Sequence, residues 1–165
     1  MGARQGSSRQ RIRDGSQYLI VDPTNRTLIT EITIREGVPA DHVQAIEVQK
    51  AAFGQVHWPF GEDAFRIAEM ADGEMVGYLV WRPTYTDEFE ILSIATQPKH
   101  QRKGVARALL REFCAAYKGD LFVEVRESNS VAIAFYSSMG FGETGIRHSY
   151  YGDTGEGAII MKLRF

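Results

Sequence analysis

The sequence predicts a mixed α/β fold, in which a central sheet is flanked by helices on both faces. Short runs rich in β-branched residues alternate with segments whose apolar residues recur at helical spacing. Of the 165 residues 44% are hydrophobic, which is enough to form one core, and no repeat or low-complexity segment interrupts the order. Strand–helix–strand units cross over right-handed and bury both sheet surfaces, which favours this arrangement.

The N-terminal part of the chain predicts a tail followed by two strands. Residues 1–17 contain four arginines among glycine, serine and glutamine, without the apolar core of a secretory signal, so we expect a disordered tail. The β-branched runs at 18–21 and 28–34 flank a turn and are expected to be strands. A single domain would then cover 18–165, with a hairpin or arm over 18–30 at its start.

A helix and a hairpin are expected next. Pro39 suits the first turn of a helix, where a missing N–H costs no hydrogen bond, and Gly54 marks the end. The residues that recur at helical spacing between them are Val43, Ile46, Lys50 and Phe53. After an irregular segment, the runs 64–71 and 75–82 flank an Asp-Gly pair at 72–73, the preferred composition of a tight hairpin turn.

The remaining elements alternate strand and helix. Residues 89–96 predict a strand that ends near Pro98, and residues 103–118 predict a helix that stops at Gly119. The apolar stripe of this helix consists of Val105, Leu109, Phe113 and Tyr117. Another helix is expected over 130–139, preceded by residues suited to capping. The other expected strands lie at 121–126, 141–151 and 158–165.

Charge and composition argue against several classes of function. The chain carries 19 basic and 21 acidic side chains, a formal charge of −2, which gives no general attraction to nucleic acid or to an anionic membrane. No apolar run approaches the roughly 18 residues that cross a bilayer, and the single Cys114 excludes an internal disulfide. These features predict a cytoplasmic protein. We also expect a monomer or a weak homodimer. The histidines lack metal-ligand spacing, so no metal site is predicted at His42, His57, His100 or His148.

A basic turn that contains glycine joins a predicted strand to the next helix, and it is expected to bind a phosphate group. The turn reads Gln101-Arg-Lys-Gly-Val-Ala106. The first N–H groups of a helix have no internal acceptor, and together with the helix dipole they favour an anion. Gly104 permits close approach of a diphosphate, while Arg102 and Lys103 add positive charge. An ordinary helix start with a solvated basic rim would explain the same residues.

Two side chains further along the chain suit amide formation, which requires a neutral amine, a site for the oxyanion and a proton for a departing thiolate. Glu124 lies in an apolar strand and is expected to act as the general base. The alternative is an ordinary surface glutamate paired with Arg126 on the same strand face. Tyr136 is the candidate general acid, although a tyrosine on an apolar helix face is commonly a core residue. Cys114 is expected to be buried and structural, which argues against a covalent acetyl-cysteine.

These motifs resemble a known family. Residues 94–110, with the order Gln-x-x-Gly-x-Ala, resemble the acetyl-CoA-binding motif of the GNAT superfamily of N-acetyltransferases. Residues 122–141 and then 146–151 are similar to the bacterial ribosomal-protein-alanine N-acetyltransferases. The resemblance covers roughly residues 32–163 and implies a GNAT-like, mostly antiparallel sheet of about seven strands with helices on both faces. The expected domain is therefore an acetyltransferase domain.

The resemblance implies acetyl-CoA as the donor and assigns roles to particular residues. Glu124 would act as base directly or through water, and Tyr136 as acid. A backbone N–H near Ile94 or Ala95 is expected to hold the oxyanion. The residues implied to bind the coenzyme are Ile94, Ala95, Thr96, Gln101, Arg102, Lys103, Gly104, Val105, Ala106, Asn129 and Tyr136. The candidates on the substrate side are Phe53, Trp58, Glu90, Tyr150 and Tyr151. For the two tyrosines the resemblance implies a loop that holds the peptide backbone. Helix capping would also explain Asn129, and packing would explain the aromatic residues.

The acceptor is expected to be the N-terminal α-amine of a peptide or protein, as in ribosomal-protein modification, attacked directly in a ternary complex. An α-amine has a pKa of about 7.7–8.0 and lysine about 10.4, so at pH 7 roughly one α-amine in ten is neutral against fewer than one lysine in a thousand. Glu90 would face the incoming ammonium group or water. Two alternatives remain open: acetylation of a small-molecule amine or lysine side chain, and a non-catalytic acyl-CoA-binding sensor. Glu124 and Tyr136 argue against the sensor.

Overall fold

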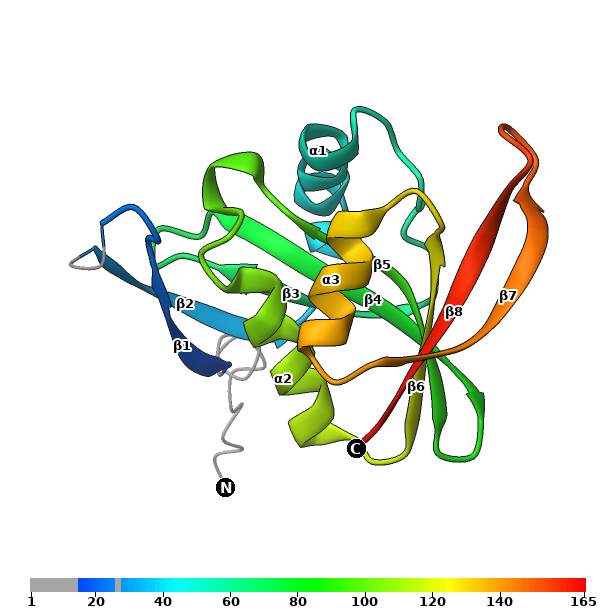
Figure 1. Ribbon diagram of the computed structural model, residues 1–165. Helices are drawn as coiled ribbons and strands as arrows, with labels where there is room; N and C mark the ends of the chain where they lie inside the picture. The colour runs from blue at the N-terminus through cyan, green and yellow to red at the C-terminus, as the bar shows by residue number, and fades with distance from the viewer. Residues whose placement is uncertain (1–14, 26–27) are drawn as a thin grey trace, which may run out of the picture. The chain divides into compact units, whose positions relative to one another are not determined.

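The computed structural model describes residues 15–25 and 28–165 and has a mixed α/β architecture (Figure 1). The described residues form eight strands: β1 (Ser16–Val21), β2 (Ile29–Glu36), β3 (Ala64–Glu69), β4 (Met75–Tyr85), β5 (Glu88–Thr96), β6 (Asp120–Arg126), β7 (Gly142–Tyr151) and β8 (Glu156–Arg164). They also form three α-helices, α1 (His42–Phe53), α2 (Val105–Ala116) and α3 (Ser130–Ser138), and short 3-10 helices at Pro39–Asp41 and Pro98–His100.

The strands are hydrogen-bonded in the order β1-β2-β3-β4-β5-β6-β8-β7. The pairs β1–β2, β2–β3, β6–β8 and β7–β8 are antiparallel, whereas β5–β6 is parallel. The predicted mixed, mostly antiparallel fold is therefore confirmed. The described residues form eight strands, one more than the seven or so that the resemblance implied.

The chain divides into two compact units, and both β4 and β5 contribute residues to each of them. The first unit contains the described residues up to Leu79 together with Ile94–Glu112. The second unit contains Val80–Ser93 and Phe113–Phe165. The turn predicted to bind a phosphate lies in the first unit, and the predicted acid and base lie in the second. The single domain expected from the sequence stays a prediction.

In the first unit, β1 and β2 form the predicted N-terminal hairpin. Their antiparallel register places Ser16 opposite Ile34 and Val21 opposite Ile29. β1 begins at Ser16, earlier than predicted, because its pairing with β2 continues to Ile34. The last residues assigned to the tail therefore belong to a strand, and residues 1–14 of that tail lie outside the described residues.

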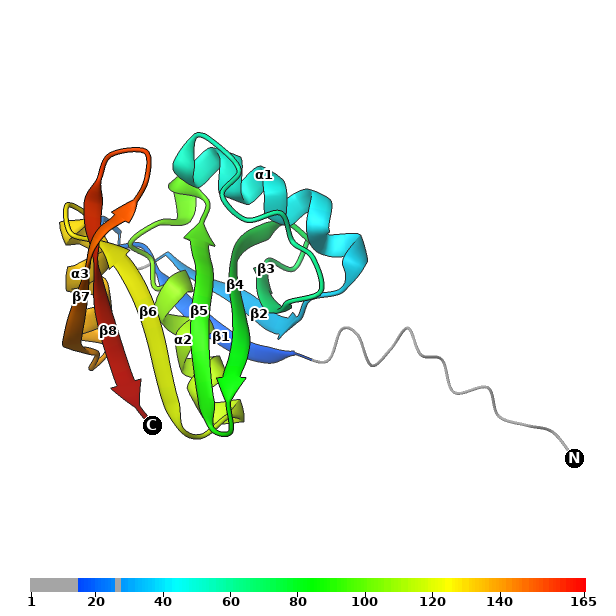
Figure 2. The same ribbon diagram turned by 90° about the vertical axis from the view of Figure 1, so that its right-hand side faces the viewer.

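The first unit has α1 and α2 on opposite faces of β4. A Cβ at Gly77 would come within 2.8 Å of Val105 Cγ1, so α2 packs directly against the β4 backbone there. Tyr78, the next residue, points to the other face, and its ring centroid lies 4.9 Å from that of Phe60. His42, the first residue of α1, contacts the Phe60 ring at 5.8 Å. Figure 2 shows the two helices on different sides of β4, as the sequence predicted.

Helix α1 is confirmed, but the face that it buries differs from the predicted one. Val43 is 71% exposed and Phe53 is 45% exposed. The residues of α1 that are buried instead are Ala45, Val48 and Gln49. Gln49 accepts a hydrogen bond from the Trp58 N–H at 2.5 Å and donates one to the Trp58 carbonyl at 2.8 Å. A polar residue therefore occupies a core position because it satisfies backbone groups of the following loop, which apolar spacing does not reveal.

Helices α2 and α3 lie within their predicted ranges. Val105, Leu109 and Phe113 of the predicted apolar stripe are at most 1% exposed. Each helix is followed by a glycine in the left-handed region, with φ of 136° at Gly119 and 95° at Gly140. Among the described residues, the helices are too short or too polar to cross a membrane.

A buried ion-pair network ties β2 to β3 and to the start of α1. Arg35 donates to the two carboxylate oxygens of Asp41 at 2.8 and 2.9 Å, and to those of Glu69 at 3.2 and 3.0 Å. The side chains of Arg35, Asp41 and Glu69 are 12%, 9% and 18% exposed. Burial would raise the pKa of Asp41, but the Arg35 guanidinium and the Val38 N–H outweigh burial and lower it. Asp41 therefore stays charged inside the unit.

In the second unit, β6 lies between β5 and β8, and β7 follows β8 (Figure 1). The parallel register with β5 runs from Glu88 opposite Asp120 to Ile91 opposite Val123. Both strands continue beyond these paired residues. The backbone N–H and carbonyl groups of the next residues of β5 and β6 therefore do not pair with each other. Glu124 is the first residue of β6 past the ladder, and it pairs in register only with β8.

An aromatic cluster around Phe113 forms part of the core of the second unit. The ring centroids of Trp81, Phe89 and Tyr117 lie 5.2, 5.4 and 4.8 Å from that of Phe113. The rings of Trp81 and Phe89 meet that of Phe113 edge to face, and the Tyr117 ring is tilted against it. Aromatic contacts at these distances stabilise a core beyond the area that they bury. The cluster packs the chain at the end of α2 against β4 and β5.

Candidate active site

The turn between β5 and α2 is fastened by polar contacts within the first unit. The Gln97 N–H donates to the Val76 carbonyl at 2.9 Å, and the Gln97 side chain donates to the Met75 carbonyl at 2.6 Å. The Gln101 side chain donates to the Thr96 carbonyl at 3.2 Å. Gln101, predicted to bind the coenzyme, thus closes the turn onto the end of β5.

The backbone of this turn adopts the left-handed conformation twice, with φ of 62° at Arg102 and 99° at Gly104. A Cβ at Gly104 would meet nothing within 4 Å, so the backbone conformation rather than a close neighbour favours glycine. The Ala108 N–H bonds to the Gly104 carbonyl at 2.9 Å, so the helical N–H groups before it have no intrahelical acceptor. An open turn with these donors fits a diphosphate.

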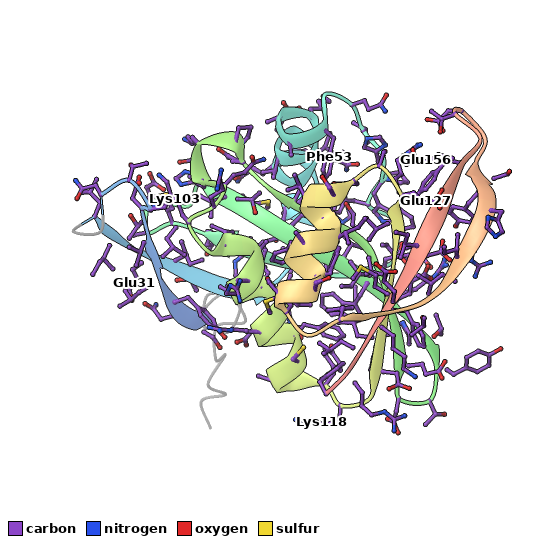
Figure 3. The ribbon with its side chains drawn as sticks, in the orientation of Figure 1. Glu31, Phe53, Lys103, Lys118, Glu127 and Glu156 are labelled. Carbon is purple, nitrogen blue, oxygen red and sulfur yellow. The ribbon has the colours of Figure 1, made fainter. Side chains whose placement is uncertain are left out.

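Lys103 in this turn is engaged by the N-terminal hairpin. Its ammonium group lies 3.1 Å from Asp22 Oδ2, and its carbonyl accepts a hydrogen bond from the Val21 N–H at 3.3 Å. Figure 3 shows Lys103 beside the β1–β2 hairpin. The positive charge that Lys103 was predicted to offer a phosphate is therefore shared with a carboxylate, a contact between distant parts of the chain that the sequence did not reveal.

The other predicted coenzyme residues of the first unit form the support of the turn. Ala95, Thr96 and Val105 are 4%, 9% and 1% exposed. Ile94 and Ala106 are partly exposed. The backbone N–H groups expected to hold the oxyanion belong to this stretch of β5, and their role stays a prediction.

In the second unit, Glu124 is the centre of a polar cluster. Its Oε1 lies 2.6 Å from the Arg147 Nε, and its carboxylate accepts a hydrogen bond from the Tyr150 hydroxyl. The Glu124 side chain is 15% exposed. The hydrogen bond to Glu124, followed by burial, raises the pKa of Tyr150, so this hydroxyl stays protonated at neutral pH. The Glu124 carboxylate therefore already has a cationic partner and a hydroxyl donor.

Arg126, considered as an alternative partner of Glu124, binds other residues. The Arg126 guanidinium lies 2.9 Å from Asp153 Oδ2 and 3.5 Å from Glu156 Oε2. It also lies 3.8 Å from the centroid of the Tyr151 ring, a cation–π contact. The alternative considered for Glu124, a pair with Arg126, is therefore contradicted, and Arg126 instead binds the tip of the β7–β8 hairpin.

Arg147 is a residue of this cluster that sequence reasoning missed. Arg147 and Tyr150 are three positions apart on β7, where strict alternation would put their side chains on opposite faces. The β7–β8 register shifts after Arg147, and Ser149 has a φ of 52°. Such an irregularity re-aims side chains, so both residues reach Glu124. A locally irregular strand of this kind has no signature in the spacing of apolar residues.

Tyr136 is buried in the second unit, with 4% of its surface exposed. Its ring centroid lies 5.2 Å from that of Phe135 and 5.1 Å from that of Phe141. Burial raises the pKa of Tyr136 above its ordinary value, so the phenol keeps its proton. The core packing weighed as an alternative is present, and in the described part of the chain no hydrogen bond joins Tyr136 to Glu124. The role as acid stays a prediction.

Asn129 is the N-cap of α3. Its Oδ1 accepts a hydrogen bond from the Ala132 N–H at 3.1 Å, and its backbone carbonyl accepts one from the Ile133 N–H at 3.0 Å. The capping explanation is therefore confirmed. A contact with the pantetheine arm stays a prediction, and the two are compatible because the cap uses the amide oxygen and leaves the amide N–H groups as donors.

The predicted substrate-side residues come from both units. In the first unit, Phe53 is exposed on α1 (Figure 3), and the buried indole N–H of Trp58 has no partner among the described residues. In the second unit, Glu90 forms an ion pair at 2.6 Å with an arginine of β4, so its carboxylate is already bound. The rings of Tyr150 and Tyr151 contact each other at 5.1 Å.

Comparison with known proteins gives one consistent result. Residues 33–141 match the Acetyltransferase (GNAT) family, so the match begins within β2 and β1 lies outside it. The "[Ribosomal protein bS18]-alanine N-acetyltransferase" of Escherichia coli (strain K12) is 38% identical over an alignment of 109 residues that covers 62% of this chain and 73% of the relative. An N-alpha-acetyltransferase of Sulfurisphaera tokodaii is 34% identical over 155 residues, covering 79% of this chain and 92% of the relative.

The fold is also similar to a solved structure. The crystal structure of the ribosomal-protein-S18-alanine N-acetyltransferase from Escherichia coli has a TM-score of 0.71 and 31% sequence identity. The similarity covers 81% of this chain and 93% of that chain.

Proposed function

The chain belongs to the acetyltransferase (GNAT) family and is an N-acetyltransferase, and we propose that it transfers the acetyl group of acetyl-CoA to the N-terminal α-amine of a protein. The observation that carries the proposal is the Glu124 cluster, in which a largely buried carboxylate is held by Arg147 and Tyr150. An acceptor ammonium group is proposed to bind this carboxylate in place of Arg147, whose side chain is 58% exposed. Two relatives named for α-amine or ribosomal-protein alanine acetylation support a protein terminus, such as that of a ribosomal protein, as acceptor.

The coenzyme is proposed to bind through its diphosphate at the turn that starts α2. Gly104 supplies the left-handed backbone, and Arg102 and Lys103 supply charge. The other residues of this proposed site are Ile94, Ala95, Thr96, Gln101, Val105, Ala106, Asn129 and Tyr136. When bound, acetyl-CoA supplies an activated thioester. The backbone groups of β5 outside the parallel ladder are suited to pair with the pantetheine arm as an added strand would.

The chemistry is proposed to divide between three groups of the chain. Glu124 takes a proton from the acceptor ammonium group, directly or through water, and a backbone N–H near Ile94 or Ala95 stabilises the oxyanion. Tyr136 donates its hydroxyl proton toward the departing sulfur. Direct attack is favoured over an acetyl-cysteine because burial raises the pKa of Cys114, which disfavours the reactive thiolate.

The acceptor is proposed to lie near the exposed aromatic side chains of the substrate side. Phe53 and Tyr150 are exposed and Tyr151 is partly exposed, and the two tyrosines carry a polar hydroxyl on an apolar ring. The buried indole N–H of Trp58 is a donor without a partner among the described residues. Glu90 would interact with the acceptor only after releasing its arginine partner. An α-amine suits this site better than lysine, because far more of it is neutral at pH 7.

The proposal is tested by incubating the protein with acetyl-CoA and a panel of acceptors while free thiol release is measured. The panel contains a peptide with a free N-terminal alanine, a lysine peptide with a blocked N-terminus, and a polyamine. Activity on the free α-amine alone is expected. Activity on the blocked lysine peptide or the polyamine alone would favour the other acceptor classes, and coenzyme binding without any transfer would favour a sensor.

Glu124→Gln is expected to lower kcat/KM for the alanine peptide by about tenfold at pH 7 and by much less at pH 9. The reason is that roughly one α-amine in ten is already neutral at pH 7, whereas most are neutral at pH 9, so the benefit of a base declines as pH rises. The measurement is the pH dependence of kcat/KM for the variant and the wild type.

Glu143→Gln is the matched control, because it makes the same change at an exposed residue of β7 in the same unit. We expect it to follow the wild-type profile at every pH. A constant ratio between wild type and Glu124→Gln from pH 7 to pH 9 would argue that Glu124 binds the acceptor rather than deprotonating it.

A further inference from the structure

The strand β1 lies outside the segment that matches the family, yet both of its ends are bound to α2 or to the turn before it. At one end, Ser16 Oγ donates to Glu112 Oε1 at 2.8 Å and Tyr18 Oη donates to Glu112 Oε2 at 2.6 Å. Burial, followed by this hydrogen bond, raises the pKa of Tyr18 to about 12. At the other end, Val21 contacts the Lys103 backbone. β1 therefore runs beside α2 from its last turns back to the predicted coenzyme turn (Figure 1).

Asp22, which follows β1, is held by its own local turn. Its Oδ1 accepts hydrogen bonds from the Thr24 N–H at 2.8 Å and from the Thr24 hydroxyl at 2.6 Å. Lys103 binds the other oxygen, Oδ2, at 3.1 Å. The Thr24 hydroxyl, the Thr24 N–H and Lys103 together hold the pKa of Asp22 well below its usual range. The position and the negative charge of this carboxylate therefore persist if Lys103 moves away.

Lys103 has the longer side chain of the pair. Its side chain is 27% exposed, and a lysine carries its charge on a flexible four-carbon stem. A diphosphate on the turn would compete with Asp22 for this ammonium group, and the Asp22 charge would repel the diphosphate. Both effects oppose coenzyme binding, while neither disturbs the backbone of the turn.

We propose that Asp22 is a positioning residue that sets coenzyme affinity: it holds Lys103 away from the diphosphate and so weakens binding of acetyl-CoA and of the product CoA. The inference rests on the proposed binding of a diphosphate at this turn. A weaker product complex favours release after transfer, so the N-terminal hairpin would tune turnover through Lys103.

The test is the Kd of CoA for Asp22→Asn, measured by isothermal titration calorimetry at low ionic strength. Asparagine keeps an oxygen for Thr24 and removes the charge. We expect the Kd to fall by about two- to fivefold, the range typical of one partly exposed ion pair. The difference should shrink at high salt, because exposed charges are screened. Asp22→Ser removes the same charge with a shorter acceptor and should give the same direction.

The matched control is Glu31→Gln, which makes the same change of net charge at an exposed residue of the same hairpin (Figure 3). We expect its Kd for CoA to equal that of the wild type. In a Lys103→Met background, Asp22→Asn should lose most of its effect, because the competition acts through Lys103.

An unchanged or higher Kd in Asp22→Asn and Asp22→Ser would overturn the inference, and so would equal tightening by Glu31→Gln. If the wild-type protein binds CoA but Asp22→Asn and Asp22→Ser do not lower the Kd, the proposed function stays intact and only this inference is overturned. A wild-type protein that binds neither CoA nor inorganic pyrophosphate would overturn the proposed function and this inference together.

Discussion

Replacing Tyr136 by phenylalanine is expected to lower kcat for acetyl transfer by about two to three orders of magnitude, the usual effect of removing one hydrogen-bond donor to a developing negative charge. The Kd for CoA should stay nearly unchanged. Tyr136 is 4% exposed and packs against Phe135 and Phe141, and phenylalanine keeps those ring contacts while it removes the hydroxyl. The loss should therefore be confined to the chemical step.

The burial of Tyr136 explains why its hydroxyl group keeps its proton. Burial raises the pKa of Tyr136, so the phenol stays protonated throughout the working pH range. A thiol has a reference pKa of about 8.5, so a departing thiolate is a weaker base than this tyrosinate. In the proposed mechanism Tyr136 then contributes mainly a hydrogen bond to the developing negative charge. Because the phenol stays protonated, it should add no ionisation to the pH profile of kcat between pH 6 and 9.

Steady-state thiol release gives kcat, and calorimetry gives the Kd for CoA. Tyr117→Phe is the matched control, because it removes a hydroxyl from another tyrosine of the second unit, within the cluster of Trp81, Phe89 and Phe113. We expect its kcat to equal that of the wild type. Wild-type kcat in Tyr136→Phe would remove this tyrosine from the mechanism, and a matching loss of CoA affinity would reassign it to coenzyme binding.

Arg35→Met is expected to lower the free energy of unfolding by about 3–5 kcal/mol, because removing one partner of a buried ion pair leaves uncompensated charge. Arg35 donates to both Asp41 and Glu69, whose side chains are 9% and 18% exposed. Asp41 Oδ2 also accepts the Val38 N–H at 2.8 Å, so the loss would loosen the entry into α1. A change of this size is a large fraction of the 5–15 kcal/mol typical of a folded domain.

The pH dependence of this effect has a definite sign. The folded state lowers the pKa of Asp41, so ionised Asp41 binds more favourably there than in the unfolded chain. The stability that it contributes is fully present above the unfolded pKa of about 3.9 and is lost as pH falls through the lower folded value. The difference between wild type and Arg35→Met should therefore be largest near pH 7 and shrink below about pH 4.

Urea denaturation followed by far-UV circular dichroism at pH 7 and at acid pH measures both quantities. Arg82→Met is the matched control, because its guanidinium is 51% exposed in its pair with Glu90, and such pairs contribute at most about 1 kcal/mol. If Arg35→Met loses no more stability than Arg82→Met at pH 7, then the buried network does not stabilise the fold as argued.

Local patterns in the sequence determined the elements of the fold and several of their ends. The stripe of α2, with Val105, Leu109 and Phe113, is buried as its spacing predicted, and Asn129 caps α3. The need for glycine at position 104 was also visible, although the reason is the left-handed backbone rather than a steric neighbour. These features depend on residues close in sequence, so propensity, capping and periodicity describe them.

The buried face of α1 was the main error in the elements. Its predicted stripe included Val43 and Phe53, which are exposed, and omitted Gln49, which is buried. Gln49 owes its position to hydrogen bonds with backbone groups of the loop that follows the helix. An apolar pattern records which residues avoid water, and it does not record which polar group a loop needs.

Only the tertiary structure decided which charged side chains meet. Glu124 pairs with Arg147 rather than Arg126, because β7 reaches β6 across β8 and an irregular stretch of β7 re-aims its side chains. Lys103 pairs with Asp22 because the N-terminal hairpin ends beside the turn before α2. Such contacts depend on strand order and register, which the packing of the whole chain sets. The sequence by itself therefore determined the elements and the family, and the fold determined the partners of the residues proposed to act.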